Sequence, residues 1–266
     1  MKSVWKISKP VHMIDFGCGY GYLGLKLLPL LPEGSKYTGI DQGEKLIEQA
    51  KDYFKGSPYE TEFFVGNIEE IEIKNQYDIA ICHAFLLHMS DPKKTLKKMI
   101  NAIVNDGKII CFEPHWISGM SSYELDGYDQ SQIVPLGVLQ KLFEKPTNIN
   151  GNIGVKLPNY LSELDVKNIE CRVSDKVNFL NREENQKMKL KLFSSLKEDG
   201  IGGAPIQKEQ FIEKLIKRGV TPNDALAQFE AEQLFSQVFN IDASFVYAPS
   251  MKITFGDIKR VHDALE

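Results

Sequence analysis

The stretch IDFGCGYGYLG, residues 14–24, decides how the rest of this chain is interpreted. Its glycines form two overlapping patterns: Gly17, Gly19 and Gly21 give G-x-G-x-G, whereas Gly19, Gly21 and Gly24 give G-x-G-x-x-G. The second pattern is typical of loops that hold a dinucleotide pyrophosphate. An apolar run before the glycines and a helical pattern after them predict a strand, a turn and a helix. Such a unit places backbone N–H groups at the carboxyl edge of a sheet, and the question is which ligand they hold.

The composition of the whole chain favours a folded protein that acts on small molecules. The 266 residues are 42% hydrophobic, which is enough for a full core, and we expect a single domain over residues 1–266 with insertions. The net charge of -4 comes from 32 basic and 36 acidic residues spread along the chain, so we expect no nucleic acid or membrane partner. No apolar stretch near the N-terminus is long enough for a signal peptide, and we therefore expect a cytoplasmic protein.

The four cysteines do not have the spacing of a metal site or a redox motif. Cys18, Cys82, Cys111 and Cys171 lie far apart without a C-x-x-C pair, and three of them fall at or inside predicted strands. We therefore expect reduced, mostly buried thiols and no metal site.

Residues 11–115 alternate strand-like and helix-like patterns, which predicts a parallel sheet with crossover helices. Helices are expected over Glu44–Phe54 and from Pro92, with Asp91 as its N-cap, to a stop at Asp106-Gly107. The expected strands are 11–16, 36–41, 62–65, 77–82 and 108–113.

The second half of the chain contains two predicted insertions, residues 117–150 and 181–240. In the second insertion, Thr221 is the expected N-cap of a helix that begins at Pro222. The last strand is expected within residues 244–255. The insertions must bury their apolar faces, and we expect them to form a lid over the sheet edge, with a helical buttress or a dimer face as alternatives. The predicted core is then about residues 10–116, 157–180 and 243–256.

Two features of the glycine stretch favour a cationic ligand over a diphosphate. Asp15 lies at the expected strand end, two residues before Gly17. Its carboxylate would face the crevice, where it would repel a pyrophosphate and attract an ammonium or a sulfonium. In a dinucleotide loop counted from Gly17, the third glycine would fall at position 22, which is occupied by Tyr22.

The stretch VHMIDFGCGYG resembles motif I of the class I S-adenosylmethionine (SAM) methyltransferases, which consists of an acidic residue, a spacer and G-x-G-x-G. The resemblance is best over residues 10–115. It implies an α/β fold with a Rossmann-like, doubly wound, seven-stranded sheet, mostly parallel with an antiparallel last strand. It also implies SAM as the cofactor and S-adenosylhomocysteine as its product. Members usually carry a helical segment before the first strand, and here Trp5 could cover the cofactor or anchor on the core.

Two further segments resemble the cofactor-binding landmarks of this family. YTGID resembles the second strand, whose last acidic residue, here Asp41, binds both ribose hydroxyls, although Asp41 could also cap the next helix. FFVGNIEEI resembles the third strand and the adenine-binding turn, with Asn67 where many members have Asp. The resemblance implies that the cofactor-binding residues are Asp15, Gly17, Cys18, Gly19, Asp41, Gln42, Gly66, Asn67, Ile68, Cys82 and His83.

Histidines in or near the last two landmarks are the candidate catalytic residues. YDIAICHAFLLHMSDP and GKIICFEP resemble the fourth and fifth strands of the quinone-biosynthesis type of small-molecule methyltransferases. His83 could take a proton from an oxygen or nitrogen acceptor, or its backbone could merely contact the cofactor. His88 matches a position where the family often has a structural histidine, and His115 could line the acceptor pocket. By contrast, His12 and His262 are expected to be structural.

The resemblance implies methyl transfer to a small molecule with an oxygen, nitrogen or carbon nucleophile, by in-line displacement. No N-P-P-Y-type tetrad follows the fourth strand, where Cys82–Phe85 stand, which argues against adenine and glutamine amide methylases. One alternative is an NAD(P)-dependent oxidoreductase, but Y-x-x-x-K occurs only at Tyr22–Lys26, in the first helix. Another alternative is a non-catalytic module that binds SAM or a protein partner. A homodimer is left open.

Overall fold

The computed structural model describes residues 5–144, 149–181 and 185–260, so His262 lies outside the described residues. The chain divides into two compact units. The core unit consists of Met1–Pro114, Ile153–Val173 and Lys252–Glu266, and the insertion unit of His115–Asn152 and Ser174–Met251. Residues 174–180 and 243–251, which we expected in the core, thus belong to the insertion unit. A single domain over the whole chain stays a prediction.

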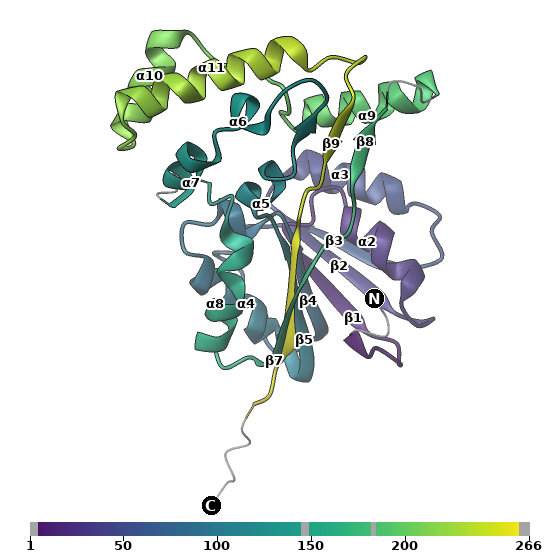
Figure 1. The fold of residues 1–266 in the computed structure, drawn as a ribbon. Helices are drawn as coiled ribbons and strands as arrows, with labels where there is room; N and C mark the ends of the chain where they lie inside the picture. The colour runs from purple at the N-terminus through teal and green to yellow at the C-terminus, as the bar shows by residue number, and fades with distance from the viewer. Residues whose placement is uncertain (1–4, 145–148, 182–184, 261–266) are drawn as a thin grey trace, which may run out of the picture. The chain divides into compact units, whose positions relative to one another are not determined.

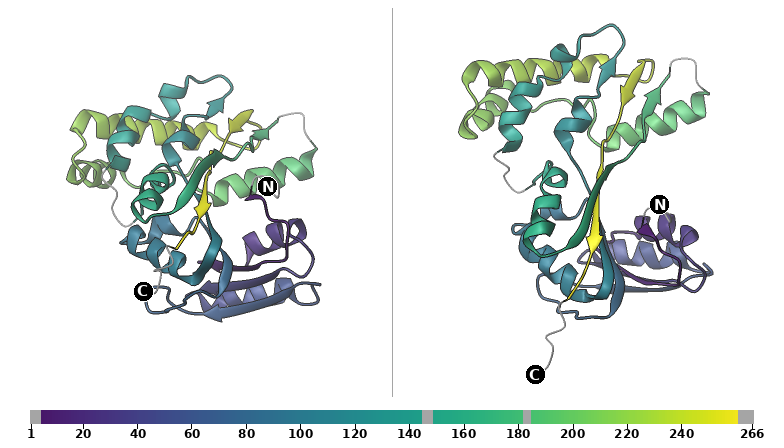
Figure 2. Two further views of the ribbon diagram at one scale, coloured as in Figure 1. Left: turned by 90° about the horizontal axis from the view of Figure 1, so that it is seen from below. Right: turned by 60° about the horizontal axis from the view of Figure 1, so that its bottom comes forward.

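The core unit is built on a seven-stranded sheet in the order β3-β2-β1-β4-β5-β10-β7 (Figures 1 and 2). Strands β1 to β5 pair in parallel, and β10 runs antiparallel to both β5 and β7. This arrangement confirms the predicted α/β fold with its antiparallel last strand. The strand order reverses between β1 and β4, and open α/β sheets bind ligands at such a reversal. The strands are β1 (His12–Phe16), β2 (Lys36–Asp41), β3 (Glu60–Val65), β4 (Tyr77–His83), β5 (Ile103–Glu113), β7 (Lys167–Val173) and β10 (Lys252–Asp257).

Helices cover both faces of this sheet (Figure 1). On one face, α2 (Tyr22–Leu27) and α3 (Glu44–Phe54) pack around the buried Tyr37 ring. On the other, α4 (Pro92–Ala102) and α8 (Leu157–Glu163) share a buried apolar cluster with Ile40. Short 3-10 helices complete the described part of the unit: η1 (Leu28–Leu30), η2 (Leu86–His88) and η3 (Ile153–Val155).

Helix α4 begins as predicted but ends earlier. The Asp91 side chain accepts a hydrogen bond from the backbone N–H of Lys94, so the predicted N-cap is confirmed. The predicted stop at Asp106-Gly107 is wrong, because the chain enters β5 at Ile103, which is fully buried and pairs with Tyr77. In the sequence, the helical spacing of apolar residues continues into the β-branched residues at the start of this strand. The pattern therefore predicts one more helical turn than the structure has.

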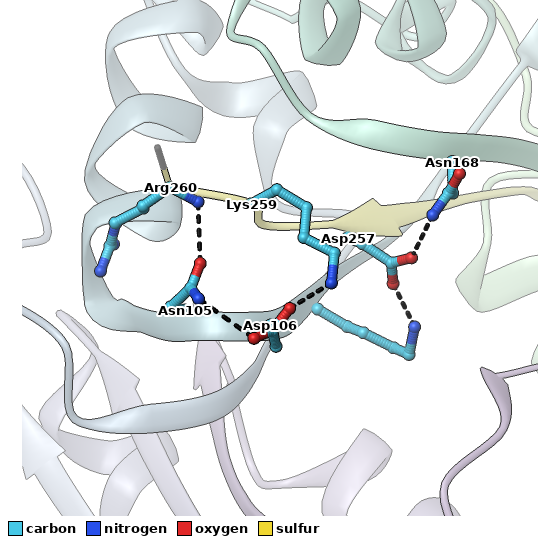
Figure 3. A network of polar contacts seen from close by, with 7 residues as sticks. Asn105, Asp106, Asn168, Asp257, Lys259 and Arg260 are labelled. Atoms are coloured by element: carbon cyan, nitrogen blue, oxygen red, sulfur yellow. Dashed lines mark hydrogen bonds and ion pairs between the residues drawn. The ribbon is translucent and has the colours of Figure 1, made fainter. Parts of the chain in front are cut away.

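Polar side chains join the start of β5 to β7 and to the end of β10 (Figure 3). Asp257 accepts hydrogen bonds from Lys108 and from Asn168, the latter at 2.7 Å. Arg260 donates to the carbonyl oxygen of Ile103 at 2.7 Å. These contacts fix the register of β10 in the sheet. The network also includes Asn105, Asp106 and Lys259.

The structure shows how the cysteines and Trp5 of the core unit are placed. Cys18, Cys82 and Cys111 are buried, as predicted, and Cys171 is exposed. The Trp5 ring packs edge-on against Phe112 and Phe255, with centroids 6.1 and 6.5 Å apart. Trp5 therefore anchors on the sheet.

The insertion unit has its own small sheet, in the order β6-β9-β8, and its own apolar core. The strand expected within residues 244–255 is in fact two strands in two sheets, because the chain leaves β9 after Tyr247 and passes through Ser250 at φ 52° before β10. The Thr221 hydroxyl accepts from the N–H of Asp224, which confirms that predicted cap. The elements are β6 (Glu124–Leu125), β8 (Asn178–Leu180), β9 (Phe245–Tyr247), α5 (Trp116–Met120), α6 (Gln130–Ile133), α7 (Leu136–Glu144), α9 (Gln186–Glu198), α10 (Lys208–Lys217) and α11 (Pro222–Val238).

The predicted role of the insertions as a lid stays a prediction. Within the three described segments, every helix is too short or too polar to cross a membrane.

Candidate functional site

The glycine stretch forms a tight turn between β1 and α2. Gly17, Gly19 and Gly21 all have positive φ, at 70°, 52° and 82°, which side chains other than glycine rarely adopt. The N–H of Gly17 donates to the carbonyl of Ile40 at 2.8 Å, so the turn is tied to β2. Gly24 has a different role: a Cβ there would come within 2.8 Å of the Tyr37 ring. The last glycine of the dinucleotide-like pattern is therefore explained by helix packing.

Asp41 joins the end of β2 to this turn. Its Oδ2 accepts from the N–H of Gly19 at 2.9 Å, and its Oδ1 accepts from the N–H of Gly43 at 2.8 Å. The N-cap of α3 is Gly43 rather than Asp41. Each carboxylate oxygen retains a lone pair, so the partly exposed Asp41 can still accept two hydroxyl groups from a ligand.

A cleft of about 290 Å³ opens at the carboxyl ends of β1, β2, β3 and β4. Seven residues predicted from the sequence line it: Gly17, Asp41, Gln42, Gly66, Asn67, Ile68 and His88. The Asn67 side chain shapes its own turn, since Oδ1 accepts from the N–H of Glu69 at 3.0 Å. The apolar part of the lining was not predicted: Ile40, Leu46, Ala84, Phe85 and Met89.

Phe85 is the most consequential of the missed residues. A Cβ on Gly17 would come within 2.2 Å of the Phe85 ring, so this aromatic side chain lies directly on the glycine turn. The sequence signal was available, because an aromatic residue in the segment after the fourth strand faces the same sheet edge as the turn.

Five predicted cofactor residues do not line the cleft: Asp15, Cys18, Gly19, Cys82 and His83. Gly19 acts on the site indirectly through Asp41, and the N–H of Cys18 donates to the carbonyl of Ile40 at 3.0 Å. Contacts of all five with a cofactor stay predictions.

The expectation that the Asp15 carboxylate faces the crevice is wrong. Asp15 is 1% exposed, and its Oδ2 accepts from Tyr37 Oη at 2.7 Å. The reason is strand alternation, which puts Asp15 on the face of β1 that α2 and α3 cover. Burial raises the pKa of Asp15 to about 7, although the hydrogen bond from Tyr37 opposes this shift. Asp41 is thus the acidic group that lines the cleft.

The structure does not bring the three candidate catalytic histidines together. His88 is exposed and lines the cleft, whereas His83 lies at the end of β4 with its ring 5.5 Å from that of Tyr22. Burial lowers the pKa of His83, so its imidazole is neutral at pH 7. His115 belongs to the insertion unit, immediately before α5, and its place in an acceptor pocket stays a prediction.

His12 has the structural role that we expected. Its Nε2 lies 2.9 Å from the hydroxyl of Thr38, and its ring contacts that of Tyr77 with centroids 4.5 Å apart. These contacts hold it against β2 and β4, away from the cleft.

The sheet order, the glycine turn and the acidic residue that ends β2 are the arrangement found in the class I SAM-dependent methyltransferase fold. A comparison with family models agrees, since the model described as a methyltransferase domain matches residues 7–131. This part of the chain is therefore similar to that family.

Curated relatives match a little over a third of the chain. A malonyl-[acyl-carrier protein] O-methyltransferase from Acetivibrio thermocellus is 36% identical over 97 residues, which are 36% of this chain and 33% of the relative. A ubiquinone biosynthesis O-methyltransferase from Rickettsia akari is 28% identical over 100 residues, or 38% of this chain and 39% of the relative. The chain thus spans less than half the length of these relatives.

Solved structures support the same fold over nearly the whole chain. Phosphoethanolamine N-methyltransferase 2 from Haemonchus contortus, in complex with SAM, has a TM-score of 0.52 at 14% identity. The match covers 97% of this chain and 51% of that protein. A candidate methyltransferase from Bacillus halodurans C-125 has a TM-score of 0.51 at 11% identity and is covered to 96%. At these identities the likeness concerns the fold alone.

Proposed function

We propose that this protein transfers a methyl group from SAM to a small-molecule acceptor with an oxygen, nitrogen or carbon nucleophile. The observation that carries the proposal is Asp41, whose two oxygens are already oriented by the N–H groups of Gly19 and Gly43 beside the cleft. The relatives named above as O-methyltransferases support this reaction class. The NAD(P)-dependent oxidoreductase and the non-catalytic module have no comparable support.

The cleft suits the chemical groups of SAM. Asp41 would accept the two ribose hydroxyls, and the turn from Gly66 to Ile68 would lie against the adenine. Ile40, Leu46, Phe85 and Met89 provide apolar walls that would pack on the base and exclude water. When bound, SAM supplies a methyl carbon activated by positive sulfur. Alignment and desolvation are then the main demands on the protein.

An acceptor that arrives protonated would also need a base, and we assign this role to His83. Because burial lowers its pKa, the imidazole is in the form that can take a proton at pH 7. His88 is exposed at the cleft and is a weaker candidate, since its side chain remains solvated. A small-molecule acceptor also fits the net charge of -4, which disfavours nucleic acid and anionic membranes. The three buried thiols support a reducing, cytoplasmic location.

Calorimetry with SAM, S-adenosylhomocysteine and NADH tests the proposal. We expect the two adenosyl compounds to bind and NADH not to bind. Asp41→Ala should weaken S-adenosylhomocysteine binding by about 1–3 kcal/mol, because two hydroxyl bonds are lost. Asp52→Ala is the matched control, since Asp52 is exposed on α3 and does not line the cleft. Binding of NADH, or equal affinity in the Asp41 variant, would refute the assignment of the site.

A further inference from the structure

Glu113, the last residue of β5, is a buried carboxyl group with an unusual set of partners. Its side chain is 0% exposed, and its Oε1 accepts from the N–H of Phe85 at 2.9 Å and of Leu86 at 2.8 Å. The thiol of Cys82 lies 3.5 Å from the same oxygen. A buried polar group is costly unless it is hydrogen-bonded, so these contacts are a condition of its placement.

The two N–H groups need such a partner, because they stand at the start of η2. The first N–H groups of a helix have no acceptor within it. Here Glu113 supplies the acceptor from a different strand. The turn before η2 is held by β5 as well: Ala84 has φ 47°, which is rare for a residue with a side chain, and its N–H donates to Phe112 O at 2.8 Å.

The segment held in this way forms one wall of the cleft. Ala84, Phe85, His88 and Met89 all line it, and the Phe85 ring lies on Gly17. Glu113 itself does not line the cleft. It therefore acts on the site through backbone groups that it holds in place.

The acceptor oxygen, not the negative charge, is what these contacts require. Oε1 carries both backbone bonds, whereas Oε2 is buried without a hydrogen-bond partner in the described part of the chain. Burial raises the pKa of Glu113 to about 7, against the hydrogen bonds from Leu86 and Phe85. An amide at this position would keep the oxygen and lose the titration.

We propose that Glu113 is a positioning residue for the cofactor cleft, whose Oε1 fixes the segment 84–89 in the conformation that receives the adenosyl compound. This inference rests on the proposed function. It goes beyond it by assigning the shape of one cleft wall to a residue that touches no ligand.

The test compares Glu113→Ala, Glu113→Asp and Glu113→Gln by calorimetry with S-adenosylhomocysteine and by hydrogen exchange of the segment 84–89. We expect Glu113→Ala and Glu113→Asp to weaken binding by about tenfold and to speed exchange of the segment, because its donors lose their acceptor. Glu113→Gln should restore binding to within about threefold of the wild type, because its amide oxygen can accept both bonds. Glu113→Asp keeps the comparison available if Glu113→Ala does not fold.

Met99→Ala is the control for a general loss of stability, because Met99 is fully buried in α4 and does not line the cleft. It should lower the melting temperature and leave the affinity unchanged. Wild-type affinity in Glu113→Ala or Glu113→Asp, or a Gln variant as weak as the Ala variant, would overturn the positioning role. If the wild type itself binds neither SAM nor S-adenosylhomocysteine, the proposed function fails instead.

Discussion

The two edges of the core sheet use carboxyl groups in opposite ways. At the amino edge of the parallel strands, Asp257 pairs with Lys108 and Asp106 pairs with Lys259 (Figure 3). At the carboxyl edge, Asp15 and Glu113 are at most 1% exposed and accept from a tyrosine hydroxyl and from backbone N–H groups. One edge balances its negative charges with lysines. At the carboxyl edge, uncharged O–H and N–H groups donate hydrogen bonds to the two carboxyl groups, which lie beneath the glycine turn and the cleft wall.

The pKa values show the same contrast. Burial alone would raise the pKa of Asp257, but the hydrogen bonds from Asn168 and Lys108 lower it below its ordinary value. At the other edge burial prevails and raises the pKa of Asp15 and of Glu113 to about 7. The difference teaches that an acidic residue near a ligand site need not act as a negative charge. Here two of them act as acceptors that shape the site.

The largest expected effect concerns pH. Burial raises the pKa of Asp15 and of Glu113 to about 7 in the folded protein, whereas the ordinary values are 3.8 and 4.5, so the unfolded chain releases these protons at lower pH. The folded state thus holds more protons in this window, and the free energy of unfolding should fall as pH rises from about 4.5 to about 7. Each residue should contribute on the order of 3 kcal/mol to this fall. Urea unfolding at several pH values measures it.

Glu113→Gln and Asp15→Asn should flatten this pH dependence, because neither amide titrates. Asp52→Asn, on the exposed side of α3, should leave it as in the wild type. If both amide variants lose stability with pH as steeply as the wild type, the contrast between the edges does not arise from protonation.

The next effect concerns the glycine turn. Gly17→Ala should weaken S-adenosylhomocysteine binding by about tenfold or more, because an alanine at φ 70° is strained and its Cβ displaces the Phe85 ring. Gly56→Ala is the matched control: its φ is 76°, but a Cβ there meets nothing within 4 Å, and it does not line the cleft. It should cost a similar strain energy and leave the affinity unchanged. Calorimetry and thermal unfolding of both variants check this, and equal losses of affinity would contradict it.

The smallest effects are expected at the amino edge. Asp257→Ala should destabilise the protein by about 1–2 kcal/mol, since the Asp257 and Lys108 side chains are only 19% and 24% exposed. Lys259→Ala should change stability less than Asp257→Ala does, because the pair of Lys259 with Asp106 is exposed to solvent. Neither should alter ligand affinity. A clear loss of affinity in either variant would show that the two edges do not act separately.

Local patterns were sufficient to predict most of the core unit. The bounds of α3 agree with the prediction. The place of Asp41 at the end of β2 came from the family resemblance, and there it accepts a hydrogen bond from the glycine turn. Hydrophobic periodicity and helix-capping residues can be recognised within a few residues of sequence, and they predict where helices and strands lie.

The misinterpreted features depend on contacts between distant residues. Tyr37 lies 22 residues from Asp15, and Phe85 lies 28 residues from Glu113. The sequence next to each acidic residue therefore does not indicate that it is buried or which group it bonds. The same limit applies to residues 244–255, where one apolar run serves two sheets. Only the pairing of β9 with β8 and of β10 with β5 separates them.

The position of β10 has a consequence for how the protein folds. This strand lies between β5 and β7, so among the described strands β7 pairs with the rest of the sheet only through residues 252–257. A nascent chain therefore cannot complete the sheet until the insertions have been synthesised and their ends brought together, which is a long-range closure of the kind that slows folding. Until then the backbone N–H and C=O groups along one side of β5 are unpaired. Such an exposed strand can be bound by a chaperone, or it can pair with another chain and aggregate.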